Sequence, residues 1–335
     1  SEKGLKQYSS YLKITQIFTK YQTGIITGRD KLAIQFTPEE MWNIVLTFSK
    51  MEPELARKAY KLGKDARDWK VKLAQEDLRK SGPSRELIVP ILYRPFDVRY
   101  TYYTGQNRGF LRWAYPQFMH HMLAGENVGV ITCRQISQSS WFHAFVSNKI
   151  TDDCIVSNRT RERGYLFLLF LYPSTDSQTI LTASKSGERK PNLHPVVLKT
   201  LAEVYGKEPS PEQIFNYIYA ILYTPTYREK YADFLRLDFP RIPFPQDQGL
   251  FNSLADLGRQ LVTLHLLESP DLESPLARFE GEGDNKVGKV KYDEKGERIY
   301  INETQFFSPV PSEIWKYRIG GYPVSYTHLT LPTKA

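Results

Sequence analysis

The segment DDCIVSNRTRERGYLFLLFLYP, Asp152–Pro173, joins a polar stretch to an apolar one and decides how the middle of the chain folds. In an extended chain, alternate side chains point to the same face. The arginines of this segment alternate with other polar residues, so they would line one face between two buried strands. We call this set the arginine comb; it consists of Arg159, Arg161 and Arg163.

The segments that precede the comb have the composition of β-strands. ELIVPILYRPFDVRYTYYT, ENVGVITCRQ and WFHAFVS, which begin at Glu86, Glu126 and Trp141, are rich in β-branched and aromatic residues. PQFMHHML, at residues 116–123, predicts a short helix among them. We therefore expect a mixed or antiparallel β-region over about residues 86–173, within a β-rich part that extends to residue 180.

The segments that follow predict helices. PSPEQIFNYIYAILYTP offers Ser210 as the N-cap, Pro211 as the first helical residue and Gln213 as the partner in a capping box. TYREKYADFL predicts a second helix, and leucines spaced over residues 250–264 predict a third. These helices should pack against the β-region and form a helical subdomain over residues 181–323.

Two smaller elements are expected near the C-terminus. KVGKVKYDEKGERIYIN predicts a peripheral β-hairpin at about residues 286–302, with its turn near Lys295 and Gly296. PSEIWKYRIGG predicts a short helix closed by Gly320 or Gly321. Together with the preceding elements, they predict an α+β fold: a mixed β-region packed against a helical subdomain, with a peripheral β-hairpin.

The first 85 residues have a weaker pattern. YQTGIITGRDKLAIQF predicts a loop with two glycines that leads into an alternating segment. In TPEEMWNIVLTF, Thr37 can cap a helix and Glu40 can complete a capping box. Residues 54–80, rich in lysine, arginine and alanine, predict a further helix that ends at the SGPS segment at 81–84.

Composition limits the class of protein. The 335 residues are 41% hydrophobic, enough to bury a core, and the net charge is +8 with a pI of about 9.2. The positive excess lies in residues 1–120, which suggests a polyanionic partner, with a solvated basic face as the alternative. Two cysteines, no signal peptide and no apolar run of bilayer length lead us to expect a soluble cytoplasmic protein with no membrane partner.

The sequence offers no catalytic constellation. It has neither the phosphate-binding loop G-x-x-x-x-G-K-[ST] nor the dinucleotide turn G-x-G-x-x-G. Asp152 and Asp153 could form a paired-carboxylate site, but no metal-ligand partner lies near them in sequence, so a loop role is favoured. We therefore expect no catalytic residue, no metal site and no cofactor in this chain.

Three polar segments instead have the composition of a nucleic-acid surface: 105–113, 133–140 and 156–163. Arginine donors match guanine O6 and N7, glutamine and asparagine amides match adenine N6 and N7, and other cations hold phosphates. The alternative is internal pairing, for instance of Arg161 or Arg163 with Asp152, Asp153 or Glu162. The candidate DNA-binding residues are Arg108, Arg112, Arg134, Gln135, Asn158, Arg159, Arg161 and Arg163.

The same residues resemble a known family. ILYRPFDVRYTYYT, FMHHMLAGENVGVITCRQ, ITDDCIVSNRTRERGYLFLLFLYP, PSPEQIFNYIYAILYTPTYREKYADFLRLDFPRIPFP and ARFEGEGDNKVGKVKYD are similar to the C-terminal target-recognition region of type ISP and related single-chain restriction–modification enzymes. The resemblance covers about residues 20–322. It implies double-stranded DNA as the partner and sequence-specific DNA target recognition as the function, within an adenine-N6 DNA methyltransferase and endonuclease.

The resemblance also implies what lies outside this chain. Intact members resemble a series of modules, nuclease, ATP-driven translocase and methyltransferase, which would use S-adenosylmethionine, ATP and Mg²⁺. The NPPY-type tetrapeptide of the methyltransferase is absent from the sequence, so residues 1–85 are expected to be a partly helical connector from that upstream module. The alternative function is a structural docking scaffold for the methyltransferase that contacts DNA only through phosphates.

The last residues need a separate interpretation. VSYTHLTLPT matches the translation of a transposon-type sequencing-library adapter. We therefore expect native sequence to end near Tyr322 or Pro323 and residues 324–335 to be a non-native tail. A natural tail is the alternative.

Overall fold

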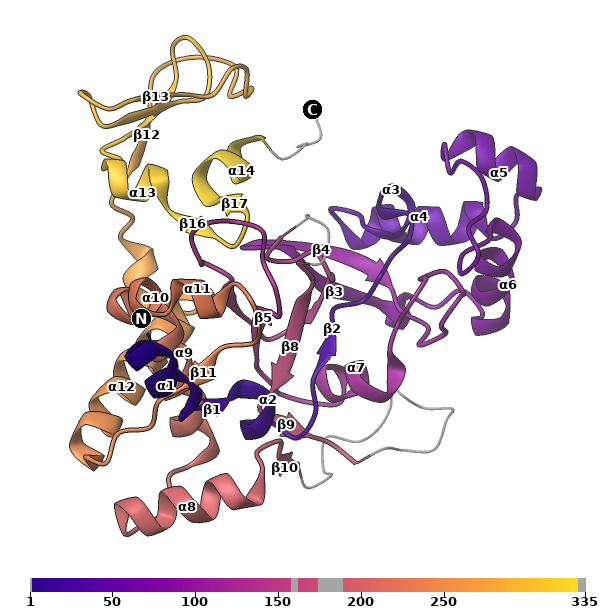
Figure 1. The fold of residues 1–335 in the computed structure, drawn as a ribbon. Helices are drawn as coiled ribbons and strands as arrows, with labels where there is room; N and C mark the ends of the chain where they lie inside the picture. Colours follow the sequence, from indigo (N-terminus) through magenta and orange to yellow (C-terminus); the bar gives the residue numbers. More distant parts are fainter. Residues whose placement is uncertain (1, 158–161, 174–188, 331–335) are drawn as a thin grey trace.

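The computed structural model describes residues 2–157, 162–173 and 189–330, and its fold is α+β, as predicted (Figure 1). The helices in these ranges are α1 (Glu2–Ser9), α2 (Ile14–Ile17), α3 (Asp30–Ala33), α4 (Pro38–Phe48), α5 (Pro53–Ala59), α6 (Val71–Ser81), α7 (Pro116–Leu123), α8 (Pro195–Tyr205), α9 (Pro211–Tyr223), α10 (Pro225–Lys230), α11 (Ala232–Leu235), α12 (Gln248–His265), α13 (Ser312–Lys316) and α14 (Val324–Thr330).

The strands are short and belong to several small sheets. They are β1 (Leu12–Lys13), β2 (Gln22–Thr23), β3 (Ile88–Arg94), β4 (Asp97–Tyr102), β5 (Gly129–Cys133), β6 (Ala144–Ser147), β7 (Ile150–Thr151), β8 (Gly164–Leu168), β9 (Phe170–Leu171), β10 (Lys190–Pro191), β11 (Arg241–Ile242), β12 (Arg278–Glu280), β13 (Lys291–Asp293), β14 (Arg298–Tyr300), β15 (Phe306–Ser308), β16 (Arg318–Ile319) and β17 (Tyr322–Pro323).

Two sheets form the centre of the molecule. One is antiparallel with the order β2-β8-β5-β6, and the other has the order β4-β3-β7, in which β3 and β7 are parallel. Every residue of β5 and β6 is buried, because both faces of these strands are covered. The predicted mixed β-region is therefore confirmed.

The helical subdomain is built around α9 and α12. The predicted capping box is present: Ser210 Oγ accepts from the Gln213 backbone N–H, and the Gln213 side chain accepts from the Ser210 N–H. The two helices pack closely at Gly258, where a Cβ atom would lie 1.9 Å from the Asn216 carbonyl oxygen. α9 is buried on most of its surface, so this pair joins the hydrophobic core that the central sheets share.

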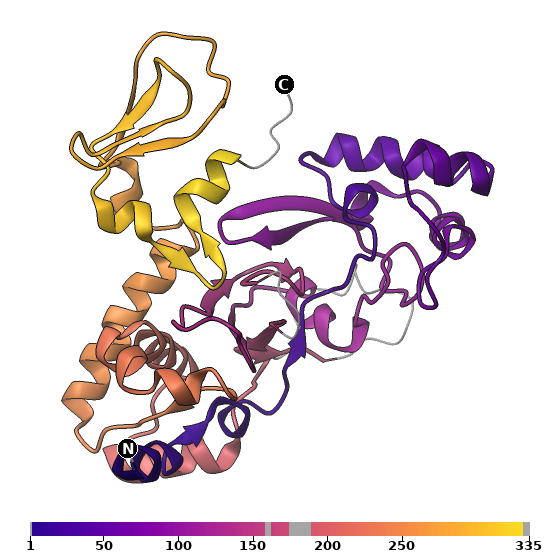
Figure 2. The same cartoon turned by 45° about the horizontal axis from the view of Figure 1, so that its top comes forward.

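The C-terminal hairpin is larger than predicted. β13 and β14 pair as expected, but they belong to a four-stranded sheet in the order β12-β15-β14-β13. This sheet and α4–α6 project on opposite sides of the central strands (Figures 1 and 2). Its buried residues Ile299, Ile301 and Val310 lie outside the main hydrophobic cluster, so the sheet is peripheral.

Two expectations about local structure were wrong: the role of Gly320 and the continuous helix over residues 54–80. Gly320 does not close α13, which ends at Lys316; it forms the turn between β16 and β17, with φ of 55°. The helix expected over residues 54–80 is broken between α5 and α6. Trp69 explains the break, because its buried indole donates to the Phe110 carbonyl 3.0 Å away and holds residues 60–70 as a loop.

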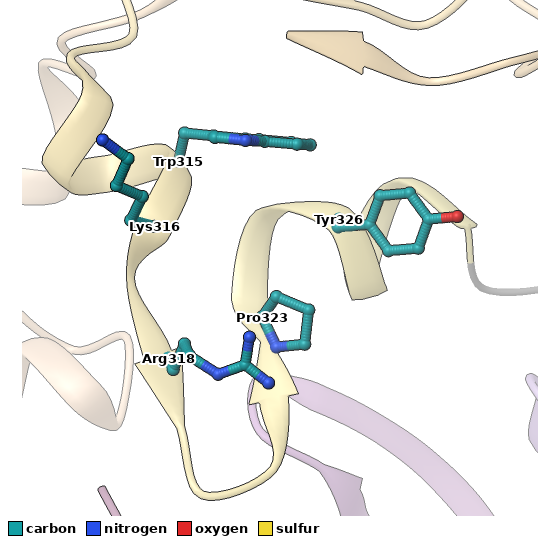
Figure 3. Close-up of a pocket in the computed structure, with 5 residues that line it drawn as sticks. All are labelled: Trp315, Lys316, Arg318, Pro323 and Tyr326. Carbon is teal, nitrogen blue, oxygen red and sulfur yellow. The ribbon is translucent and has the colours of Figure 1, made fainter. Parts of the chain in front are cut away.

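The expected tail forms α14, which has no buried residue. Its Tyr326 ring lies 6.3 Å from the Trp315 ring, and His328 Nε2 lies 2.6 Å from the Pro95 carbonyl oxygen. Figure 3 shows Trp315 and Arg318 facing Pro323 and Tyr326 across an open pocket of about 500 Å³. Among the described helices, none is long and apolar enough to cross a membrane.

Candidate nucleic-acid interface

One extended segment, residues 22–27, runs between the strand that follows the comb and the polar segment 105–113. β2 pairs with β8 through Gln22 and Leu166, and the Gly24 N–H then donates to Gly164. The following residues exchange backbone hydrogen bonds with residues 151–153 and then with 112–113. The sequence predicted a loop here, but the backbone is a continuous ladder. At about 3.3 Å per residue, the positions that bond to Gly164 and to Arg112 lie roughly 10 Å apart along it.

Gly24 makes the ladder possible. A Cβ atom at this position would lie 2.4 Å from the carbonyl carbon and oxygen of Asp152, a distance that side chains do not adopt. Any other residue would therefore push the segment away from residues 152–153. The glycine that the sequence showed only as part of a loop is a close-approach position.

The end of the sheet next to the comb gathers several candidate residues. Cys133 on β5 is paired with Gly164 on β8, so Arg134 and Arg163 follow and precede that pair on neighbouring strands. Arg134, Gln135 and Arg163 are exposed. Asn158, Arg159 and Arg161 lie outside the described residues, so the proposed comb rests on the sequence at those positions.

Glu162 ties two of the polar segments together. Its carboxylate accepts from the Ser137 N–H at 2.5 Å and from the hydroxyls of Ser137 and Ser157, and His143 Nε2 lies 3.9 Å away. Burial raises the pKa of Glu162, but the serine hydrogen bonds outweigh it and the pKa is lowered overall. Glu162 is buried and Arg163 exposed, as strand alternation predicts for these two residues.

The segment that precedes the comb, residues 153–156, is not a strand, contrary to expectation. Asp152 Oδ1 accepts from the Cys154 N–H at 2.9 Å, which forms a turn over residues 153–156. The two aspartates each face an arginine: Arg94 Nη1 lies 2.7 Å from Asp152, and Arg163 Nε lies 3.7 Å from Asp153. Internal pairing, the alternative to DNA contact, is therefore present for Arg163.

These aspartates also belong to a possible metal-ligand group. Ligand atoms of Asp152, Asp153 and Cys154 lie within 4.8 Å of one another. Burial raises the pKa of Asp152 to about 7 and also raises the pKa of Asp153. Because each carboxylate already faces a guanidinium, the arrangement fits a buried turn better than a cation site.

Arg108 and Arg112 are brought together by a residue that the sequence did not single out. Their guanidiniums lie 3.3 and 3.5 Å from the carboxylate of Asp68, and Arg67 lies 2.8 Å from it. The hydrogen bond from Arg67 is the main reason that the pKa of Asp68 is lowered. We call Arg67, Arg108 and Arg112 the Asp68 cluster. Three cations share one anion, which leaves a net positive surface.

Arg134 belongs to a second shared-carboxylate group. Its Nε lies 3.4 Å from Asp238, which also accepts from Lys13 Nζ at 2.6 Å. Asp68, Asp238 and Lys13 were missed because their partners are far away in sequence. The lysines and arginines of residues 61–70 were the available signal, but the composition of residues 54–80 predicts only a helix.

The chain matches the model of the Type ISP C-terminal specificity domain over residues 16–330. It belongs to this family. The search of curated proteins found no match. The family match includes the comb, the Asp68 cluster and the ladder between them.

Three solved structures share the fold of this Type ISP domain. They are a cryo-EM DrdV–DNA complex (24% identity, TM-score 0.67), a nuclease-deletion mutant of the Type ISP enzyme LlaGI with a DNA substrate mimic (21%, 0.64) and the Type ISP enzyme LlaBIII bound to DNA (18%, 0.71). Matches cover 91%, 95% and 98% of this chain but only 30%, 29% and 22% of those chains. The chain therefore spans less than a third of each.

Proposed function

We propose that this Type ISP specificity domain recognises a DNA target sequence for a restriction–modification enzyme that methylates adenine and cleaves DNA. The observation that carries the proposal is the ladder of residues 22–27, whose backbone bonds successively to Gly164, to residues 151–153 and to residues 112–113. Membership of the family supports it, and so do the DNA complexes of the three enzymes that share the fold.

Two kinds of contact follow from the geometry. The Asp68 cluster suits phosphates, because one carboxylate gathers its three guanidiniums and the three side chains remain 87%, 58% and 38% exposed. Arg163, Arg134 and Gln135 lie at the end of a buried sheet, where side chains are suited to read base edges. On this proposal, S-adenosylmethionine, ATP and Mg²⁺ act on the upstream modules, and this chain supplies specificity.

The test is selection of duplexes from a random library by the 335-residue chain. Enrichment of one motif, with weaker binding to scrambled competitor at equal salt, is expected. Equal binding to all duplexes would contradict the proposal. Methyl transfer from labelled S-adenosylmethionine or ATP hydrolysis by this chain alone would also contradict it, because specificity would then not be its separate role.

A docking scaffold remains the second candidate, and one observation favours it. α12 buries Phe251, Ala255 and Val262 against α9, yet Leu250 and Leu257 on another face of the helix are 51% and 58% exposed. A protein module, the upstream methyltransferase, would cover these leucines. In that case the chain binds DNA through phosphates only, and the selection experiment yields affinity without a motif.

A further inference from the structure

A pocket of about 370 Å³ lies between the loop that follows β5 and the helices α9–α11, apart from the ladder and the Asp68 cluster. Its size is in the range of small-molecule sites. The residues that matter for its chemistry are Ser139, Ser140, Trp141, Phe142, Tyr223 and Arg228.

Arg228 is a cation without an anionic partner. In the part of the chain that the structure describes, no carboxylate lies within ion-pair distance of its guanidinium. Its Nε donates to the Leu222 carbonyl at 2.5 Å, whereas its buried Nη2 has no hydrogen-bond partner among the described residues. A buried charged donor left in this way is costly unless something else accepts from it.

Aromatic rings surround this guanidinium. It lies 4.2 Å from the centre of the Tyr223 ring, 5.5 Å from Trp141 and 5.8 Å from Phe142. The Trp141 side chain is 2% exposed, and its Nε1–H also has no partner in the described ranges. The pocket therefore combines aromatic side chains, a guanidinium without an anionic partner among the described residues and, at its rim, the exposed Ser139 and Ser140.

We propose that this pocket binds a nucleotide. A base would stack on the partly exposed ring of Phe142, as bases do on aromatic platforms in single-strand binding proteins. Its phosphate would accept from Arg228, and the serine hydroxyls would contact the sugar or the base edge. An anion without a ring would leave Phe142 unused, and a ring without an anion would leave Arg228 unpaired.

The nucleotide could be free or could be turned out of DNA, and these two sources share this chemistry. Ser139 and Ser140 belong to the same polar segment as Arg134 and Gln135, so DNA at the candidate interface would lie near the pocket. The DNA source rests on the proposed function; binding of free nucleotides does not.

Calorimetric titration of the 335-residue chain with dAMP, dGMP, dCMP and TMP tests the pocket, with adenosine and inorganic phosphate as the two half-ligands. Nucleotides should bind more tightly than either half. Arg228→Gln should weaken binding about tenfold or more, since a charge-assisted hydrogen bond is lost. Arg85→Gln is the matched control, because Arg85 also lies over a tryptophan, Trp42, away from the pocket.

Two further variants separate binding from folding. Ala232→Phe should fill the pocket and weaken nucleotide binding without removing a hydrogen bond of Arg228. Glu229 lines the pocket and is exposed, so its carboxylate should repel the nucleotide phosphate. Glu229→Gln should therefore strengthen nucleotide binding, whereas a variant with a damaged fold would bind more weakly. Absence of nucleotide binding, or binding unchanged in all three pocket variants, would overturn the proposal.

Duplexes that carry 2-aminopurine identify the source. A fluorescence increase on binding that is lost in Ala232→Phe, while affinity for the duplex persists, indicates a nucleotide turned out of DNA. Free-nucleotide binding with no such increase indicates a free nucleotide, and it supports the pocket even if the chain shows no sequence-specific DNA binding.

Discussion

Glu162 and Asp68 are both buried carboxylates, 1% and 2% exposed, but their partners differ in kind. Glu162 accepts hydrogen bonds from neutral groups of the protein, those of Ser137 and Ser157. Asp68 faces the guanidiniums of the Asp68 cluster, which remain open to solvent. Burial alone therefore does not show the role of a charged side chain. Glu162 joins two polar segments of the chain, whereas Asp68 positions arginines toward an external ligand.

The strongest test of this comparison is Glu162→Ala. The substitution removes the acceptor of the Ser137 N–H and of two serine hydroxyls and empties a buried site, so we expect a loss of about 2 kcal/mol or more in the free energy of unfolding. Urea denaturation measures it. The counterpart Asp68→Ala should lower the denaturation midpoint less, because the side chains of Arg67 and Arg108 are mostly exposed and water can replace the carboxylate. Equal losses in the two variants would remove the distinction.

His143 sharpens the same comparison through pH. Burial lowers the pKa of His143 to about 4, although Glu162 opposes the shift. The unfolded chain, with a histidine pKa near 6.5, binds the proton more readily, so this residue costs stability as pH falls from about 6.5 to 4. Neither ring nitrogen has a hydrogen-bond partner among the described residues. His143→Leu should therefore reduce the loss in free energy of unfolding between pH 6.5 and pH 4 by up to about 3 kcal/mol.

The measurement is urea denaturation of wild type and His143→Leu at pH 7 and pH 4.5. The two should differ little at pH 7, and the variant should be the more stable at pH 4.5. A variant with the same pH dependence as wild type would show that His143 is protonated in the folded state and paired with Glu162.

The comb gives the next largest effect. A bidentate arginine–guanine contact is worth about 1–3 kcal/mol of discrimination, whereas a phosphate contact is insensitive to sequence. We predict that Arg161→Ala in the intact enzyme relaxes one position of the methylated sequence. Arg159→Ala and Arg163→Ala should weaken binding to all sequences.

Methylome sequencing of a host that expresses each variant reads out specificity, and salt titrations of binding accompany it. The ion pair of Arg163 with Asp153 already shows that one comb residue has an internal partner. If Arg161→Ala methylates the same motif with the same fidelity and only stability falls, the comb is an internal ion-pair group.

The Asp68 cluster should act on salt dependence alone. Each phosphate contact releases about one counterion, so Arg108→Gln and Arg112→Gln should each reduce the slope of log K against log salt by about one unit. Affinity should fall equally for target and random duplexes, as filter binding at several salt concentrations would reveal. A change of preferred sequence in either variant would place the cluster at a base edge.

Much of the fold was predictable because its signals are local. Ser210 and Gln213 lie within one helical turn, so the capping box and α9 can be inferred from three residues. The break at residues 60–70 could not be inferred in this way. It depends on Trp69 and Phe110, which are distant in sequence, and this tertiary contact overrides a helix-favouring composition.

The candidate site was predictable by residue type but not by arrangement. Arg108 and Arg112 were identified from their composition, yet the carboxylate that brings them together lies about forty positions earlier in the chain. Gly24 is similar, because its role depends on the approach of Asp152. Residues on different strands meet through pairing registers, which short-range patterns do not encode.

The smallest expected effect is that of the C-terminal tail, a region outside both carboxylate groups. α14 has no buried residue, although Val324 packs against the core and His328 lies against the Pro95 carbonyl. Deletion of residues 324–335 should therefore change the free energy of unfolding by no more than about 0.5 kcal/mol, as for other surface changes. Thermal denaturation of the two forms measures this difference. The family match extends to residue 330, so a large fall in melting temperature would show that the segment is native and that the adapter interpretation is wrong.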